Sequence, residues 1–136
     1  MIQPIVTSPI FLAMPSEPAG PGDEQVAQDL LDTLAAHEDE CVGLAGNMID
    51  VRKRIIVFDN DGTPGVMFNP ELIGREGAYQ TEESCLSLKG ARETTRWERI
   101  TVHYQDERFA WHTEQFAGWT AQIIQHEIDH CNGVVI

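Results

Sequence analysis

The feature that most constrains this chain lies near its C-terminus, in the segment QHEIDHCNG. Within it, His126 to His130 form an H-E-x-x-H pattern. On an α-helix, residues four positions apart lie one above the other, so His126 and His130 are able to share one cation. Glu127 neighbours this face, where its carboxylate can reach the water that such a metal site activates. The pattern therefore predicts a helix that faces the inside of the protein.

The surrounding residues favour a buried helix that begins at Gly118 and ends near Asn132. Apolar residues at Ile123, Ile124 and Ile128 flank the two histidines. The glycine that follows the helix is a typical C-terminal stop. Two surface histidines on an acidic helix are the alternative interpretation. A buried His-Glu-His cluster without an ion would be costly, so we favour a metal site.

The third protein ligand has to lie upstream of this helix. The six residues after His130 contain no His, Asp or Glu, and Cys131 adjoins His130 on the wrong side of the helix. Two imidazoles and one thiolate would leave a fourth position open for water, as a catalytic site requires. Cys85 stands out as a ligand candidate because it lies in the apolar-flanked segment EESCLSL. The alternative is that Cys85 is a small buried hydrophobic residue. The candidates are Cys41, Cys85, His37, His103, His112 and several carboxylates.

Composition limits the class of protein. At 136 residues the chain has the size of one domain, so we expect a single domain over residues 1–136. Its net charge of −13 would repel phosphate backbones, which argues against direct nucleic-acid binding and predicts a solubilising surface. No apolar run is long enough to span a membrane. Three cysteines and no export signal predict reduced thiols and a cytoplasmic location.

The rest of the pattern predicts an α+β domain with mixed or antiparallel strands around the C-terminal HExxH helix. Asp23 is a plausible N-cap for a helix that ends near His37, and Val26, Leu30 and Leu34 form its apolar stripe. Residues 14–22 are rich in Pro and Gly and favour a loop, and Asn60-Asp61-Gly62 favours a turn. We expect strands at 54–59, 66–68, 71–73, 100–104 and 109–116, and a final short strand at 134–136.

Three stretches in order resemble the signatures of the peptide deformylase family. They are VGLAG (residues 42–46), ESCLS (residues 83–87) and QHEIDHCNG (residues 125–133), which are similar to the family patterns GxGLAAxQ, EGCLS and QHExDHLxG. The intervening segments RIIVFD and VMFNP have family-like spacing. The resemblance therefore covers nearly the whole chain.

The resemblance implies a role for each matching residue. Cys85, His126 and His130 would bind the metal, and Glu127 would be the general acid and base. The backbone N–H of Leu86 would donate to the oxyanion, and Val42 and Gly43 would border the substrate, as would Leu86. The family typically uses Fe²⁺, and Zn²⁺ or Ni²⁺ can occupy the same donors.

The activity implied is hydrolysis of an N-formyl amide on the N-terminal methionine of peptides, which releases formate. Glu127 would take a proton from the attacking water and pass it to the leaving amine. Some family members continue into a C-terminal helix that docks on the ribosome. We do not expect ribosome tethering through such a helix here.

The chain departs from the family patterns at several positions, which makes it a divergent, deformylase-like member. The glutamine of GxGLAAxQ, whose amide donates to the oxyanion, falls on Met48, and a thioether cannot donate. We expect Asn47 to lie in an extended segment and to point the other way. The smaller departures are Cys41, Gly46, Ser84 and Cys131.

Met48 leaves two alternatives to formyl-methionine hydrolysis. One is a hydrolase of the same fold that acts on another N-acyl amide, and the other is a catalytically silent metal-binding homologue. The intact Glu127 favours an enzyme.

Asp129 points away from both histidines by helical rotation, so we expect it to be structural and to pair with Arg92 or Arg96.

Overall fold

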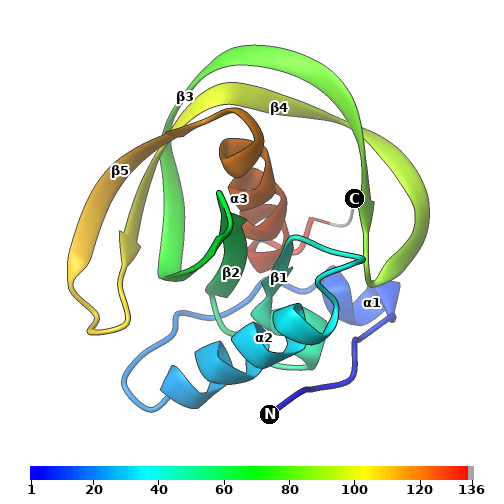
Figure 1. The fold of residues 1–136 in the computed structure, drawn as a ribbon, viewed down its shortest axis with the longest axis vertical. Coiled ribbons are helices and arrows are strands. Elements are labelled where there is room, and N and C mark those ends of the chain that lie inside the picture. The colour runs from blue at the N-terminus through cyan, green and yellow to red at the C-terminus, as the bar shows by residue number, and fades with distance from the viewer. Residues whose placement is uncertain (135–136) are drawn as a thin grey trace.

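Five antiparallel strands and a buried C-terminal helix form the centre of the fold, seen in a computed structural model that describes residues 1–134 (Figure 1). The strands follow one another in space in the order β1-β2-β3-β4-β5. This confirms the α+β prediction, with antiparallel rather than mixed pairing in the sheet. The elements are α1 (Pro9–Leu12), α2 (Glu24–Ala36), β1 (Gly43–Ala45), the 3-10 helix η1 (Gly46–Ile49), β2 (Ile55–Asn60), β3 (Thr63–Cys85), β4 (Leu88–Gln105), β5 (Trp111–Ala117) and α3 (Gly118–Cys131).

Strands β3 and β4 form a long ribbon that curves around α3 (Figure 1). The predicted strands at 66–68 and 71–73 are both parts of β3, so the prediction of a break at Asn69-Pro70 was wrong. The register shifts between Phe68 and Glu71, and Asn69 has a φ of 53°, in the left-handed region that Asn tolerates. A β-bulge therefore accommodates the Asn-Pro pair without ending the strand.

The strand predictions at 54–59, 100–104 and 109–116 are confirmed with small changes of boundary. The predicted strand at 54–59 is β2, which runs from Ile55 to Asn60 and leads into the predicted turn. The alternation at 100–104 lies within β4, where Ile100 and Val102 are buried. Strand β5 begins at Trp111 rather than at residue 109, because Phe109 has a φ of 61° and closes a turn onto Asp106.

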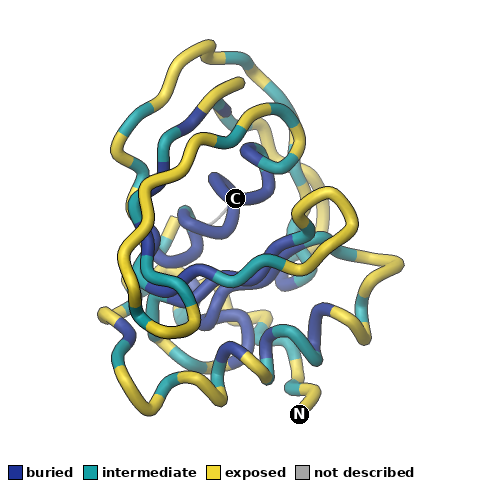
Figure 2. Tube along the Cα trace, turned by 60° about the vertical axis from the view of Figure 1, so that its left-hand side comes forward, coloured by how far each residue is buried: buried dark blue, intermediate teal, exposed yellow. Residues whose placement is uncertain are grey.

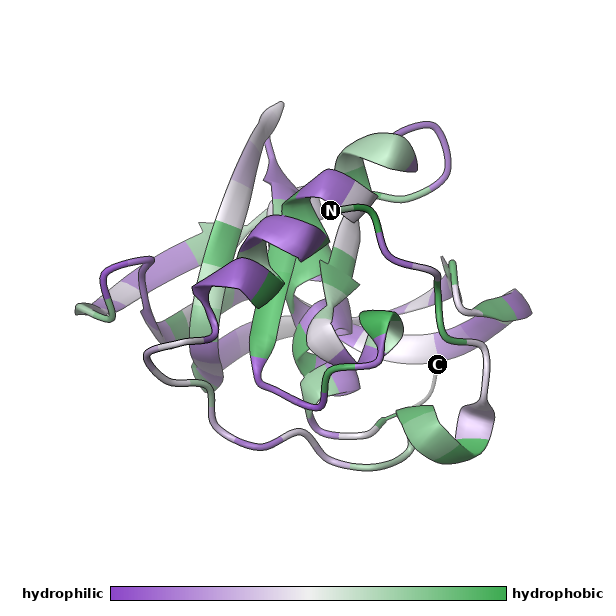
Figure 3. Ribbon diagram, turned by 90° about the horizontal axis from the view of Figure 1, so that it is seen from below, coloured by the Kyte–Doolittle hydropathy of each residue, from purple (hydrophilic) through white to green (hydrophobic). Residues whose placement is uncertain are grey.

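Two helices cover the two faces of β2. All four residues from Ile55 to Phe58 are buried, although successive side chains point to opposite faces. Helix α3 packs on β2 and β4, and α2 packs on β1 and β2. Figure 2 shows α3 as buried along most of its length, and Figure 3 shows a largely hydrophilic outer side of α2. The apolar stripe of α2 is confirmed at Leu30 and Leu34, which are buried, while Val26 is half-buried.

The ends of the chain differ from the predictions. Helix α1 was not predicted, although Ser8 caps it and Pro9 begins it. Val134 is not in a strand, and residues 135–136 of the predicted final strand lie outside the described residues. Within residues 1–134, every helix is too short or too polar to cross a membrane.

Candidate metal centre and active site

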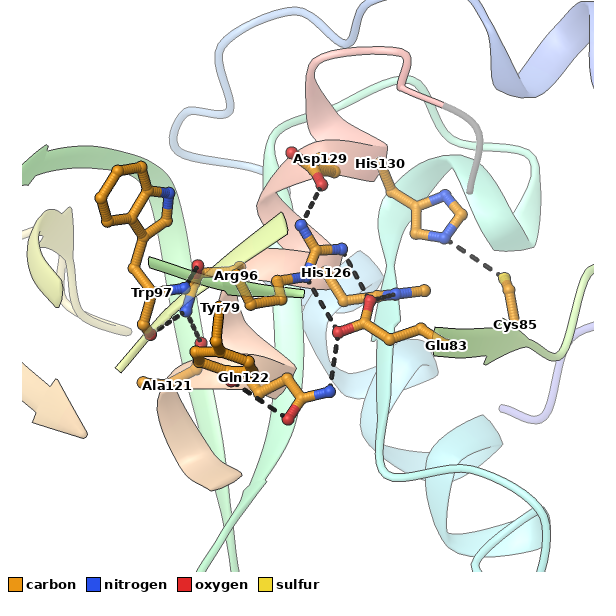
Figure 4. Close-up of polar contacts among 11 residues, drawn as sticks. Tyr79, Glu83, Cys85, Arg96, Trp97, Ala121, Gln122, His126, Asp129 and His130 are labelled. Atoms are coloured by element: carbon orange, nitrogen blue, oxygen red, sulfur yellow. Dashed lines mark hydrogen bonds and ion pairs between the residues drawn. The ribbon is translucent and has the colours of Figure 1, made fainter. Parts of the chain in front are cut away.

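Cys85, His126 and His130 converge on one point in the interior. Cys85 is the last residue of β3, and the two histidines lie one turn apart on α3. Their ligand atoms all lie within 4.8 Å of one another, and Cys85 Sγ lies 3.2 Å from His130 Nε2 (Figure 4). His126 is 8% exposed and His130 is 1% exposed. Of the upstream ligand candidates, the fold brings Cys85 to the histidine pair.

This donor set fits a divalent transition metal ion. One thiolate and two imidazole nitrogens are ligands that Fe²⁺, Zn²⁺ and Ni²⁺ accept, and three protein ligands leave a position for water. Burial, with smaller contributions from His126 and Arg96, lowers the pKa of His130 to about 3, so its ring is neutral near pH 7. Burial lowers the pKa of His126, but hydrogen bonds to Cys85 and Glu83 outweigh it and raise that pKa to about 10. A neutral imidazole is the form that binds a metal, so a metal ion binds His130 as it is and displaces a proton from His126. The residues therefore suit the ion that the pattern predicts.

Glu83 holds His126 in place from behind. His126 Nδ1 lies 2.8 Å from Glu83 Oε1, which accepts its proton and leaves Nε2 free to face Cys85. Arg96 donates to both Glu83 oxygens, at 2.9 and 2.7 Å, and Gln122 donates to Oε2 at 2.9 Å. Burial raises the pKa of Glu83, but the hydrogen bonds from His126 and Arg96 outweigh it and hold the pKa at about 2. Glu83 is therefore an ionised, fixed acceptor (Figure 4).

The role of Glu83 was not predicted from the sequence, although a signal for it was present. Glu83 and Cys85 are two positions apart on β3, so both side chains point to the same face. The prediction for Asp129 is confirmed at Arg96, whose Nη1 lies 2.7 Å from Asp129 Oδ2. Arg96 thus bridges α3 to β3 from its place on β4.

Glu127 lies beside the ligand group with a carboxylate oxygen free to act. The residue is 4% exposed, and its Oε1 has no hydrogen-bond partner among residues 1–134. Burial raises its pKa to about 7, which suits a group that takes and returns a proton near neutral pH. Gly43 lies close against it: a Cβ at this position would lie 2.8 Å from Glu127 Oε2, so the carboxylate would have to shift. The close approach of β1 therefore confines the carboxylate.

A cavity of about 540 Å³ opens onto Glu127. Val42, Gly43 and Leu86 all line it, together with Cys85. All of the residues for which the sequence suggested a substrate contact therefore line one space. The full lining is Glu38, Asp39, Glu40, Cys41, Val42, Gly43, Met48, Glu82, Glu83, Ser84, Cys85, Leu86, Trp119, Gln122, Ile123, His126 and Glu127.

Met48 also lines this cavity, and Asn47 does not take its place. The thioether of Met48 accepts a hydrogen bond from the N–H of Ala45 at 3.4 Å. Asn47 was expected in an extended segment, but residues 46–49 form η1, because the chain turns sharply after β1 to pack under α3. The Asn47 amide donates to the backbone oxygen of His130 at 3.0 Å. That amide therefore supports α3 and is not directed at the cavity.

The other candidate ligands from the sequence lie elsewhere. His37 bonds the backbone oxygen of Thr33, and His112 pairs with Asp106 at 2.7 Å. His103 stacks on Trp111, with ring centroids 4.5 Å apart. Cys41 lines the cavity but lies outside the ligand group.

Comparison with known proteins gives the same family from sequence and from structure. The family model for polypeptide deformylase matches residues 3–136. A peptide deformylase of Clostridium beijerinckii is 51% identical over 136 residues, which is all of both chains. A peptide deformylase of Chlorobaculum parvum is 34% identical and covers 99% of this chain and 78% of its own length.

Solved structures have the same architecture. The crystal structure of peptide deformylase from Thermotoga maritima superposes with a TM-score of 0.90 at 29% identity, over 99% of this chain and 95% of its own. A class I type b peptide deformylase from Acinetobacter baumannii with bound Met-Ala-Ser superposes with a TM-score of 0.89 at 25% identity, over 99% of this chain and 97% of its own.

Proposed function

This chain belongs to the polypeptide deformylase family, and we propose that it removes the formyl group from N-terminal formyl-methionine of peptides. It is a metallohydrolase of the peptide deformylase type. The observation that carries the proposal is the convergence of Cys85, His126 and His130 beside the unpaired carboxylate of Glu127. We propose that one deformylase domain spans residues 1–136. The cytoplasmic location stays a prediction from the cysteines.

Cys85, His126 and His130 are the residues that would hold the metal ion. We propose Fe²⁺ as the resident ion, with Zn²⁺ or Ni²⁺ as ions that the same donors accept. When bound, such an ion supplies Lewis acidity, which makes water more acidic and polarises a carbonyl. Glu83 holds the His126 ring so that its Nε2 faces the other two metal ligands. The Asn47 amide donates to the backbone oxygen of His130 and so holds α3 at that residue.

Glu127 would move the proton during hydrolysis. With a pKa of about 7, its carboxylate takes a proton from the water that attacks the formyl carbon. It then returns this proton to the methionine nitrogen as the C–N bond breaks, which releases formate and a free amine. The cavity walls at Val42, Gly43 and Leu86 would align the peptide between β1 and the end of β3.

The backbone N–H of Leu86 would stabilise the negative oxygen of the tetrahedral intermediate. Met48 supplies no second donor, because a thioether only accepts hydrogen bonds. Asn47 supplies none either, since its amide donates to His130. We therefore propose a deformylase with a weakened oxyanion site rather than one in which another side-chain amide has replaced the glutamine.

Formate release from paired peptides tests this function. Protein loaded anaerobically with Fe²⁺ is given formyl-Met-Ala-Ser and acetyl-Met-Ala-Ser, and formate or acetate is measured. We expect formate from the first peptide and little acetate from the second. Faster release of acetate would point to another N-acyl substrate. No release from either peptide by fully metal-loaded protein would favour a silent metal-binding homologue.

A further inference from the structure

His130 has a buried ring nitrogen that makes no hydrogen bond to the described chain. Its Nε2 faces Cys85 Sγ at 3.2 Å, and the second ring nitrogen points away from Cys85 (Figure 4). A neutral imidazole carries one proton, which lies on Nδ1 when Nε2 serves as a ligand atom. His130 is 1% exposed, and its Nδ1 has no partner among residues 1–134. Because a buried donor left unpaired destabilises a fold, we expect an acceptor beside this nitrogen.

The other histidine of the ligand group shows what such an acceptor does. His126 Nδ1 lies 2.8 Å from Glu83 Oε1, which fixes the orientation of that ring. Histidines that bind a metal almost always donate their second ring N–H to a carboxylate, a backbone carbonyl or a water. Loss of that acceptor typically weakens metal binding by about 10–100-fold. An acceptor for His130 would therefore act on metal affinity as well as on packing.

Asn47 has an unpaired acceptor on the same amide that already contacts His130. The residue is 0% exposed, and its Nδ2 lies 3.0 Å from the backbone oxygen of His130 and 3.5 Å from that of Leu12. Both N–H groups of the amide thus point at carbonyl oxygens, and a flipped amide would place Oδ1 against the same two oxygens. The orientation of Oδ1 is therefore fixed. This oxygen has no partner within residues 1–134.

The other buried, unpaired acceptors of the described chain lie on other sides of the His130 ring. They are Ser16 Oγ, Ser87 Oγ and Glu127 Oε1. The N–H of Ser87 donates to Cys85 Sγ at 3.4 Å, so Ser87 lies on the Nε2 side. Glu127 lines the active-site cavity, and Ser16 contacts the backbone oxygen of Cys131 at the C-terminal end of α3. Side chains on a helix lean toward its N-terminus, away from that end. The carboxamide oxygen on η1 is thus the acceptor best placed for the ring.

We propose that Asn47 is a positioning residue for His130, and that its Oδ1 accepts the Nδ1–H of His130 through one buried water. A water accepts from Nδ1 while it donates to Oδ1, so it satisfies both atoms. With the bond from Nδ2 to the backbone oxygen, one amide then holds the main chain and the ring of the same ligand. This inference rests on the proposed metal centre and extends it. The two histidines have different anchors, an ionised carboxylate for His126 and a neutral amide for His130.

A crystal structure of the zinc-loaded wild-type protein tests the contact itself. We expect one ordered water within about 2.7–3.2 Å of both Asn47 Oδ1 and His130 Nδ1. A His130 Nδ1 that donates to another group, with no link to Asn47, would overturn the proposal. Because this measurement uses the wild-type protein, it does not depend on the folding of any variant.

Zinc affinity shows whether the contact acts on the metal ligand. Asn47→Leu removes the amide with little change in volume, and Thr33→Val is the matched control. Thr33 is also 0% exposed, and its hydroxyl also makes two hydrogen bonds, but it lies on α2 and outside the lining of the active-site cavity. The dissociation constant for Zn²⁺ is measured by competition with a chromophoric chelator, and the melting temperature is measured in parallel. We expect both variants to lose thermal stability, and only Asn47→Leu to bind zinc about 10–100-fold more weakly.

Unchanged zinc affinity in folded Asn47→Leu protein, or an equal loss of affinity in Thr33→Val, would overturn the proposal. If Asn47→Leu does not fold, the wild-type crystal structure decides. Failure of the proposed function is a separate result, because it means that zinc-bound and iron-bound wild-type protein release no formate from formyl-Met-Ala-Ser. The affinity measurement needs no turnover, so it decides about Asn47 in that event as well.

Discussion

Replacing Arg96 by Met should destabilise the protein strongly, because Arg96 joins three elements through buried charges. Its side chain is 5% exposed and its partners Glu83 and Asp129 are 8% and 26% exposed. Methionine keeps much of the volume but removes all three hydrogen bonds. The Glu83 carboxylate then remains buried without a cation, with only His126 and Gln122 as donors.

The expected size of the effect follows from this burial. Breaking a buried ion pair by removing one partner costs about 3–5 kcal/mol, and the larger exposure of Asp129 places its share at the low end. A domain of this length has an unfolding entropy near 0.29 kcal/mol/K, from about 2.1 cal/mol/K per residue. The melting temperature should therefore fall by about 10–17 °C.

Calorimetry of metal-loaded Arg96→Met measures this shift, and Arg99→Met is the matched control. Arg99 lies on the same strand and pairs with Glu76, but these side chains are 59% and 70% exposed. Solvent screens an exposed pair, which contributes little to stability, so the control should lose far less than Arg96→Met. Glu83→Gln added to Arg96→Met should recover part of the loss by removing the buried charge. Equal shifts for Arg96→Met and Arg99→Met would refute this reasoning.

Three further predictions concern the cavity. Cys85→Ala should lose most of its bound metal, and elemental analysis that found a full equivalent would rule out this ligand. Met48→Gln should raise kcat on formyl-methionyl peptides by about tenfold with little change in KM. A lost oxyanion donor typically costs about 10²–10³-fold in kcat, and a bound ion would compensate for part of that loss. Steady-state kinetics that show no gain in kcat would argue against the weakened oxyanion site. Burial, with a smaller contribution from Glu127, raises the pKa of Cys41 to about 11 from a usual value of 9.0. At pH 8, iodoacetamide should therefore label Cys41 about a hundredfold more slowly than it labels a cysteine peptide, as followed by mass spectrometry. The labelling rate should rise with pH up to about 11. Equally fast labelling at pH 8 would contradict that pKa.

The sequence predicted best where one face of an element is buried. The apolar residues around His126 and the alternation at 100–104 each reflect a surface packed on the core, and both elements are present. The middle of the β3–β4 ribbon, residues 74–99, was not predicted as strand. Most of its residues are exposed, so neither face imposes an apolar pattern on the sequence.

The candidate site was predictable in part for a similar reason. The spacing of His126 and His130 is a local property of one helix, so the sequence displays it directly. The contact between Cys85 and these histidines depends on a ribbon that curves around α3, and spacing alone left several ligand candidates open. The resemblance to the family selected Cys85. Glu83 was missed because its partners, His126, Arg96 and Gln122, come from distant parts of the chain.

Parallel measurement of metal content and formate release in Glu127→Gln tests the central claim most directly. Glutamine keeps the size of the side chain but cannot take a proton from water at neutral pH. We expect this variant to hold the same amount of metal as the wild-type protein and to release formate from formyl-Met-Ala-Ser at least about 10²-fold more slowly. Near-normal formate release by metal-loaded Glu127→Gln protein would contradict the assignment of Glu127 as the group that moves the proton.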